Sequence, residues 1–345
     1  MGVEDGPLES GANPHKEGAP FGGGPYRRIL SIDGGGIMGT FPAAFLTALE
    51  EDVGPPIGRF FDLICGTSTG GIIAIGLALG MSARELLDLY ERRGPEIFGA
   101  ANKLDASLGV IGRAVRHAFS PKHDAHRLCA VLTEALGERR IGDAKHRLVV
   151  PAWEADSRSV YIFKTAHHPR LKTDYKRKAL DAAMGTAAAP TFLRRHRTQE
   201  GVGLVDGGVW ANNPTALAVI EAIALLKWPA EDLRVLSLGC VNEIYALPEA
   251  PGVGGVVFDL SRLFMSGQSH GALGMAKLLL GHEYERESLF RVCPDVPKNL
   301  FKLDDTTKIE RLKGLGYSRA REWQPRLGPV FFTEPASPFT PIYQL

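Results

Sequence analysis

A short apolar run that ends in a cluster of glycines and then passes into a helical pattern most limits how this chain can fold. The stretch is RRILSIDGGGIMGTFPAAFLTALEE, residues 27–51. The apolar run predicts a buried strand, and apolar residues at positions 41, 45, 46 and 49 predict a helix. Glycines between a strand and a helix let bare backbone N–H groups come close to a negative group. The stretch therefore predicts a strand–turn–helix unit that faces either a bound phosphate or an oxyanion.

Strand-like and helix-like patterns alternate along the chain. Further runs that predict strands are FFDLIC, RLVVPAWEA, SVYIFKT, GVGLVDGG and LRVLSLG. Helices are expected after residue 70, from a capping box of Ser82 and Glu85 onward, over 124–137, and after residue 213. This alternation predicts an α/β fold of three layers, in which a mainly parallel central sheet carries helices on both faces.

We interpret the chain as three regions. Residues 1–25 lack the basic start and the apolar core of a signal peptide and are interpreted as a flexible tail. Residues 26–240 contain the alternating pattern and form the expected catalytic domain. Residues 241–345 are interpreted as a mostly helical extension packed on that domain, with a second capping-box pattern at Thr307 and Glu310.

Charge and cysteine usage exclude several classes of protein. The net charge is +1 over 345 residues, so no overall field attracts a nucleic-acid polymer, and we expect none as a partner. Four widely spaced cysteines without a C-x-x-C pair indicate neither a zinc site nor a disulfide scaffold. The longest apolar run, residues 72–81, is about half of what a bilayer span needs. We therefore expect a cytoplasmic protein.

The glycine cluster has three interpretations. Gly34, Gly36 and Gly39 match G-x-G-x-x-G, as in a dinucleotide-binding fold, but the second strand lacks the acidic residue expected at its end, and no Gly-Lys-Ser/Thr follows. The cluster also suits an ordinary tight turn. In the third interpretation, the backbone N–H groups of Gly34, Gly35 and Gly36 form an oxyanion hole at a helix N-terminus. The loop alone does not choose among them.

A candidate nucleophile lies in the next turn. Ser68 stands in GTSTG, a G-x-S-x-G flanked by Gly66 and Gly70, between an apolar strand and an apolar helix. That context is typical of a nucleophile elbow, a strained turn that lifts the serine out of the sheet. The alternative is a glycine-rich turn whose serine merely caps the helix.

A serine needs a base in order to act as a nucleophile, and Asp206 is one candidate. It ends an apolar strand in GLVDGGVWANNP, and Gly207 and Gly208 let the chain turn away from its carboxylate. We expect this strand to deliver Asp206 to the sheet edge that carries Ser68. A carboxylate is a weak base, so such a pair would depend on the oxyanion hole for much of its rate. By itself, D-G-G also suits an ordinary turn.

Three motifs in this order resemble the patatin-like phospholipase family. DGGGIMG resembles the family's oxyanion loop, GTSTG its serine elbow and DGG its catalytic aspartate. The segments AAAPTFL (187–193), ANNP (211–214) and SLG (237–239) resemble further features of the family. The similarity covers residues 27 to about 240.

The resemblance implies a patatin-like fold and a Ser68–Asp206 dyad that uses no histidine, metal or cofactor. It implies a phospholipase A type of reaction, in which membrane glycerophospholipids are hydrolysed and free fatty acids are released. The protein would act peripherally at the inner face of the membrane. One departure is Met38, which stands where the family usually has a basic residue. Any role of that basic residue must be absent here or filled by another residue. The backbone N–H groups of the glycine loop do not depend on it.

A basic patch is a candidate contact for anionic lipid headgroups or for a phosphorylated regulator, at about 1 kcal/mol per residue near a membrane. A solvated charge run is the plain alternative. The patch comprises Lys164, Arg170, Lys172, Lys176, Arg177, Lys178, Arg194, Arg195 and Arg197.

A looser resemblance connects the compact domain and its helical tail with bacterial anti-phage phospholipases that cyclic nucleotides switch on. It implies a cyclic dinucleotide as activator, and residues after 240 are candidates for covering the active site or for a homo-oligomer contact. Two other functions stay open. The chain could be a nucleotide-binding sensor with an inert serine, or an esterase with a Ser–Asp–His triad that uses His270 or His282.

Overall fold

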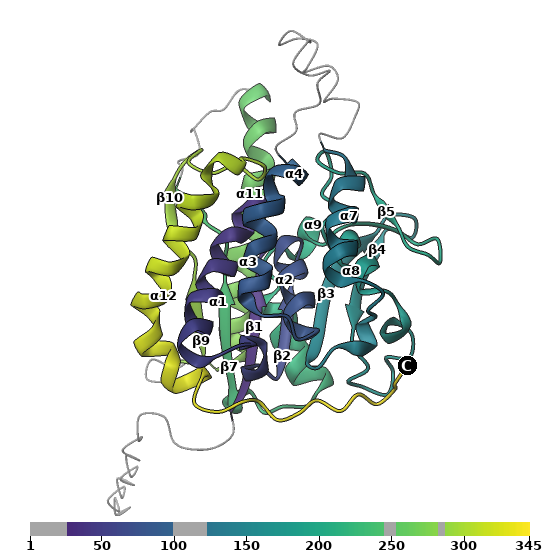
Figure 1. The fold of residues 1–345 in the computed structure, drawn as a ribbon, viewed down its shortest axis with the longest axis vertical. Coiled ribbons are helices and arrows are strands. Elements are labelled where there is room, and N and C mark those ends of the chain that lie inside the picture. Colours follow the sequence, from purple (N-terminus) through teal and green to yellow (C-terminus); the bar gives the residue numbers. More distant parts are fainter. Residues whose placement is uncertain (1–25, 99–122, 245–252, 282–286) are drawn as a thin grey trace, which may run out of the picture.

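A computed structural model describes residues 26–98, 123–244, 253–281 and 287–345. The tail expected over residues 1–25 lies outside the described residues. The described chain forms an eight-stranded central sheet and a small two-stranded one. The fold is therefore α/β, and Figure 1 shows helices around the central sheet.

The central sheet is mainly parallel, as the sequence predicts. Its parallel part has the order β3-β2-β1-β7-β9, β4 and β6 both pair antiparallel with β3, and β5 pairs antiparallel with β6. The strands are β1 (Arg27–Ile32), β2 (Leu63–Gly66), β3 (Arg147–Glu154), β4 (Ser159–Lys164), β5 (His196–Arg197), β6 (Gly203–Asp206), β7 (Leu233–Leu238) and β9 (Leu289–Val292). Side chains of β1, β2 and β7 are almost all buried, which is typical of a sheet covered on both faces.

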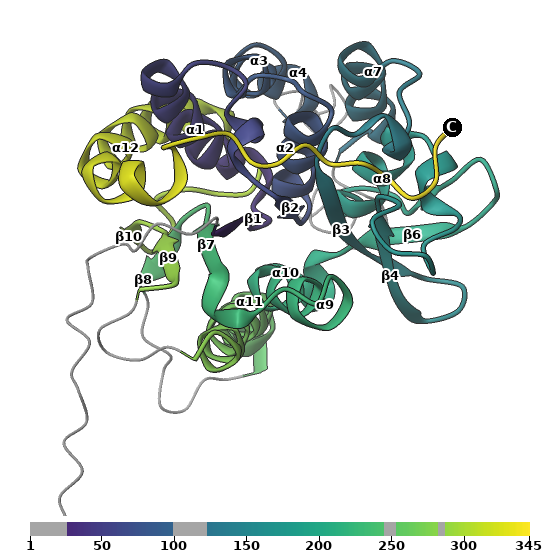
Figure 2. The same ribbon diagram turned by 90° about the horizontal axis from the view of Figure 1, so that it is seen from below.

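Helices cover both faces of the sheet and complete three layers (Figure 2). One face carries α1 (Thr40–Val53), α2 (Thr69–Ala78), α3 (Ala83–Asp88), α4 (Gly94–Phe98), α7 (Ala125–Leu136), α8 (Ala179–Thr186) and α12 (Ile309–Phe331). The other carries α9 (Gly208–Ala211), α10 (Thr215–Ile220) and α11 (Val253–Leu279). Each face has its own apolar cluster, and the cluster beside α10 and α11 includes Ala218, Ala222 and Ala276.

Local signals in the sequence set most helix boundaries. The Ser82 and Glu85 capping box is present, and α7 begins after Asp124 and ends before Gly137. The prediction of a second capping box at Thr307 and Glu310 is wrong. Asp305 accepts a hydrogen bond from the Thr307 N–H and opens a short 3-10 turn, so α12 follows that turn without a side-chain cap.

The chain after residue 240 forms strands as well as helices. Besides α11 and α12, it contributes β9 to the central sheet, and β8 (Asn242–Ile244) pairs with β10 (Asp295–Pro297). Helix α12 packs along α1, and the last residues cross the lower edge of the molecule (Figures 1 and 2). This region is therefore part of the structure that holds the glycine loop. Within the described ranges, no helix combines the length and the apolar character that crossing a bilayer requires.

Candidate active site

Ser68 occupies a strained turn between β2 and α2. Its φ is 54° and its ψ is −124°, a conformation that costs a residue with a side chain about 1–3 kcal/mol. The turn is tight because a Cβ on Gly66 would lie 2.1 Å from the carbonyl oxygen of Gly70. The Ser68 N–H donates to Thr186 Oγ1 at 2.9 Å, but the Ser68 side chain makes no capping bond to the helix. The geometry favours an elbow over a simple helix cap.

Strand β6 carries Asp206 to Ser68, and it runs in the opposite direction to β2. Strand β6 is antiparallel to β3, whereas β2 is parallel to it. Because β4 occupies the other edge of β3, β2 and β6 lie end to end along one edge, and their C-terminal ends point toward each other. The two side chains meet because β3 extends beyond β2, and not because two parallel strands end at the same sheet edge.

The Asp206 carboxyl group is buried, with 5% exposed. Loss of solvation raises its pKa to about 6, although hydrogen bonds from the Gly208 N–H and from the Ser68 side chain act in the opposite direction. The Gly208 N–H donates to Oδ1 at 2.6 Å. A carboxylate with such a pKa is a better base near neutral pH than an ordinary aspartate.

Two of the three glycines predicted to form the oxyanion hole line the cavity. Gly35 and Gly36 line it together with Ser68, and within the described part of the chain no acceptor is recorded for their N–H groups. The Gly34 N–H differs from the expectation, because it donates to the Asn212 carbonyl oxygen at 3.0 Å. Gly36 has a φ of 56°, and a Cβ there would meet the Leu303 carbonyl oxygen at 2.3 Å, so the loop requires glycine at this position.

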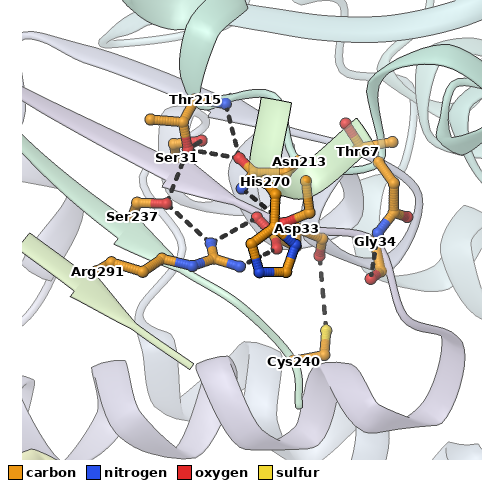
Figure 3. A network of polar contacts seen from close by, with 12 residues as sticks. Ser31, Asp33, Gly34, Thr67, Asn213, Thr215, Ser237, Cys240, His270 and Arg291 are labelled. Carbon is orange, nitrogen blue, oxygen red and sulfur yellow. Dashed lines mark hydrogen bonds and ion pairs between the residues drawn. The ribbon is translucent and has the colours of Figure 1, made fainter. Parts of the chain in front are cut away.

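A polar network beneath the loop includes Arg291 of β9, which the sequence analysis missed (Figure 3). Arg291 donates to both carboxylate oxygens of Asp33, at 3.0 and 2.5 Å, and to Ser237 Oγ at 2.9 Å. Burial raises the pKa of Asp33, and Arg291 opposes that shift. Because a buried aspartate at the end of a strand needs a cation, Asp33 was the one signal in the sequence that pointed to this pair. The sequence did not identify the partner, because Arg291 lies 258 positions away.

The same network explains two segments that the sequence analysis singled out. Asn213, from ANNP, accepts from the N–H and the hydroxyl of Thr215 at 3.0 and 2.6 Å. Thr215 Oγ1 lies 2.7 Å from Ser237 Oγ, from SLG, and Ser237 contacts Arg291. These polar residues therefore hold the strand ends around Asp33 (Figure 3).

A cavity of about 520 Å³ opens above Ser68 and Asp206 and is mostly apolar. Its walls come from both helical layers and from the 187–193 segment. Lining side chains include Ile72, Leu89, Ile97, Leu128, Val131, Leu132, Phe192, Leu193, Val209, Phe264, Met265 and Leu303. An apolar cavity of this size suits an alkyl chain beside a small polar centre.

Tyr90 supports the turn that follows Ser68. It lies in a π-helical turn, Leu89–Arg93, and its hydroxyl is 2.5 Å from Thr69 Oγ1 and 3.1 Å from the Thr69 carbonyl oxygen. Gly39, the last motif glycine of the loop, packs against the same threonine. Thr69 is thereby held from two sides beside the cavity.

The histidine alternative gains no support from the described residues. His270 is exposed on α11, and its Nδ1 lies 2.8 Å from the Ser266 carbonyl oxygen. His282 lies outside the described residues. Among the residues that the structure places, no histidine lines the cavity.

The basic patch divides into paired and exposed residues. Lys164, Arg177 and Lys178 form ion pairs with Glu221, Glu200 and Glu138. Arg195 and Arg197 both approach Asp156. The remaining four are exposed and have no ion pair in the described ranges: Arg170, Lys172, Lys176 and Arg194. The patch as a whole is therefore not one surface of free cations.

Comparison with known proteins identifies the class. A profile described as patatin-like phospholipase matches residues 30–219, more than half of the chain. The chain is a lipid acyl hydrolase. It belongs to the patatin-like phospholipase family.

Two bacterial relatives are described as cGAMP-activated phospholipases. The one from Pseudomonas aeruginosa is 36% identical over 291 residues, which cover 81% of this chain and 83% of the relative. The one from Vibrio cholerae is 35% identical over 234 residues, which cover 64% of this chain and 66% of the relative. A solved structure, VipD from Legionella pneumophila, is 12% identical with a TM-score of 0.46, and the match covers 88% of this chain and 67% of that one.

Proposed function

We propose that the chain hydrolyses acyl esters of membrane glycerophospholipids with Ser68 as nucleophile and Asp206 as base. The single observation that carries this proposal is the buried Asp206 carboxyl group beside the strained Ser68, at the base of an apolar cavity. Asp206 accepts the Ser68 proton as Oγ attacks the ester carbonyl, and it returns that proton to the lysophospholipid oxygen as the ester C–O bond breaks and the acyl-enzyme forms. Water then attacks the acyl-enzyme, which releases a free fatty acid and restores the Ser68 hydroxyl.

The oxyanion of each tetrahedral intermediate would be held by the amides of Gly35 and Gly36, with Thr69 as a candidate third donor. Gly35 and Gly36 line the cavity together with Ser68, which supports this proposal. The Gly34 amide instead fixes the loop to Asn212. Preorganised donors of this kind are worth about 3–4 kcal/mol each to a transition state, which would compensate for the weak base.

We further propose that a cyclic dinucleotide activates the enzyme and that it acts in anti-phage defence at the inner face of the cell membrane. Support comes from the two relatives described as cGAMP-activated. Rearrangement or assembly of a homo-oligomer is the expected consequence of activation, because an enzyme of this kind must stay quiet until it is needed.

The test measures fatty-acid release from phospholipid vesicles by the wild-type protein and by Ser68→Ala and Asp206→Asn, each with and without cyclic GMP–AMP. We expect release only from the wild type with the activator. A different cyclic dinucleotide serves as the matched control. Wild-type rates in either variant would refute the dyad.

The sensor alternative has a separate readout. A fluorophosphonate probe labels only an activated serine, so labelling of the wild type that Ser68→Ala abolishes would exclude an inert serine. Tight nucleotide binding without labelling or hydrolysis would favour the sensor.

A further inference from the structure

The mouth of the cavity has an exposed apolar rim. Phe264 and Val209 line the cavity and are 66% and 52% exposed, and Leu263, next to Phe264 on α11, is 40% exposed. Pro190 and Thr191, across the mouth, also line the cavity and are exposed. We call these five residues the apolar rim. Single exposed apolar side chains are ordinary, but a group of them around an opening marks a binding surface.

The helix that supplies much of this rim carries little charge. Between Ser261 and Gly281 the sequence has no acidic residue, and its only basic residues are Arg262 and Lys277. Ala276 on the inner side of α11 packs in the apolar cluster beside α10, and the same helix exposes the large apolar side chains of Leu263, Phe264, Met275, Leu278 and Leu279. An ordinary surface helix has a polar outer face.

We propose that the apolar rim enters the headgroup layer of a phospholipid bilayer and that the cavity takes its lipid directly from there. This inference rests on the proposed function and names the surface through which the same site meets its substrate. The bilayer is the favoured occupant because the rim is continuous with a cavity that reaches Ser68. A lipid that enters through this mouth keeps its acyl chains in apolar surroundings from the membrane to the active site.

One cation of the basic patch supports the same orientation. Arg194 follows the cavity-lining Leu193, is exposed, and has no ion pair in the described part of the chain. An exposed arginine next to an apolar rim suits lipid phosphates, since apolar insertion and headgroup attraction act together at membrane interfaces. The upper part of the molecule in Figure 1, where α7 and α11 lie, would then face the bilayer.

The first experiment measures vesicle binding without catalysis. On a Ser68→Ala background, Phe264→Ser and Leu263→Glu are compared with Leu278→Glu by co-sedimentation with phosphatidylethanolamine and phosphatidylglycerol vesicles, with and without cyclic GMP–AMP. Leu278 is the matched control because it is 84% exposed on the same helix but is 14 positions from Phe264. We expect the rim variants to bind roughly tenfold more weakly or worse, and the control to bind like its parent.

The second experiment separates docking from chemistry on the active protein. Leu263→Glu does not alter a cavity-lining residue, so we expect it to lose vesicle hydrolysis and to keep the rate on a soluble short-chain ester, with the same nucleotide present. Unfolding midpoints check that each variant is folded. If the wild type hydrolyses no ester but the rim variants lose vesicle binding, the proposed function fails and the docking surface stands.

Other outcomes would overturn the docking surface. Vesicle binding that is equal in rim variants and parent, or absent from the parent in both conditions, would do so. An equal loss in Leu278→Glu would overturn it as well, because the loss of vesicle binding would then not be specific to the apolar rim.

Discussion

Arg291 holds Asp33 with two hydrogen bonds, although the two residues are 258 positions apart in the sequence. Asp33 ends β1 and precedes the glycine loop, so the pair fixes the base of that loop. Met38, which stands where the resemblance led us to expect a basic residue, packs against the apolar core. Arg291 therefore supplies a cation beneath the loop from β9, the strand at one edge of the sheet.

Removal of Arg291 should be costly. Arg291→Met leaves the Asp33 carboxylate buried without its partner, and loss of one member of a buried pair costs about 3–5 kcal/mol. We expect that loss in the free energy of unfolding, measured with urea. Arg326→Ala is the control, because the Arg326–Glu287 pair is largely exposed and should be worth less than about 1 kcal/mol. Similar losses in both variants would contradict a buried pair.

Activity should depend on the protonation of Asp206. The base must be ionised to accept the serine proton, so we expect kcat/KM to rise with pH around an apparent pKa of about 6. The profile should be measured on a soluble ester, which separates it from pH effects on vesicles. A profile that is flat from pH 5 to 8 would argue against Asp206 as the base.

The same raised pKa of Asp206 predicts that the stability of the protein falls over the pH range in which its activity is expected to rise. Folded Asp206 holds its proton more tightly than the unfolded chain, so the protein loses stability as pH rises from about 4 through about 6. Asp206→Asn cannot ionise. Relative to the wild type, it should gain up to about 3 kcal/mol of unfolding free energy above pH 6 and little below pH 4, while losing activity. Equal stability of the two proteins at pH 5 and pH 8 would refute the shift.

The strained turn at Ser68 predicts an order of stability between two variants of this residue. Glycine adopts a φ of 54° without the cost that a Cβ adds, so Ser68→Gly should be more stable than Ser68→Ala by about 1 kcal/mol. Thermal unfolding of the two proteins measures the difference. Greater stability of the alanine variant would mean that the turn stores no strain.

Tyr90→Phe should affect the rate more than substrate binding. The hydroxyl holds Thr69, the residue after Ser68, and its removal leaves a buried threonine oxygen without this partner. We expect kcat to fall roughly tenfold with KM nearly unchanged. Tyr161→Phe is the control, because that hydroxyl bonds to Asp174, which does not line the cavity. Equal effects on kcat in both variants would remove Tyr90 from the positioning of the site.

Local patterns predicted much of the site because its parts are short and contiguous. The glycines around Ser68 predicted a strained turn, and the structure has one with a φ of 54°. The alternation of strands and helices predicted the three-layer fold. Roles for Ser68, Asp206 and the loop amides stay predictions until activity is measured.

Other features depend on pairings that no local pattern encodes. Strand β6 runs antiparallel to β3, with which it pairs. The Gly34 N–H donates to the carbonyl oxygen of Asn212, which lies far along the chain. Lys164 likewise forms an ion pair with Glu221, so it is not one of the free cations of the predicted basic patch. Periodicity locates strands but not their neighbours, so the sequence did not predict the direction in which β6 runs.

The position of β9 at the sheet edge has a consequence for the time at which the protein becomes active during its synthesis. A growing chain contains Ser68 and Asp206 long before β9 leaves the ribosome, and Asp33 has no Arg291 until then. The glycine loop is thus the last part of the site to receive its anchor. An unfinished chain, or one cut before β9, contains Ser68 and Asp206 without the Arg291 anchor of the loop, so under the proposed function we expect such a fragment to be less active than the whole protein.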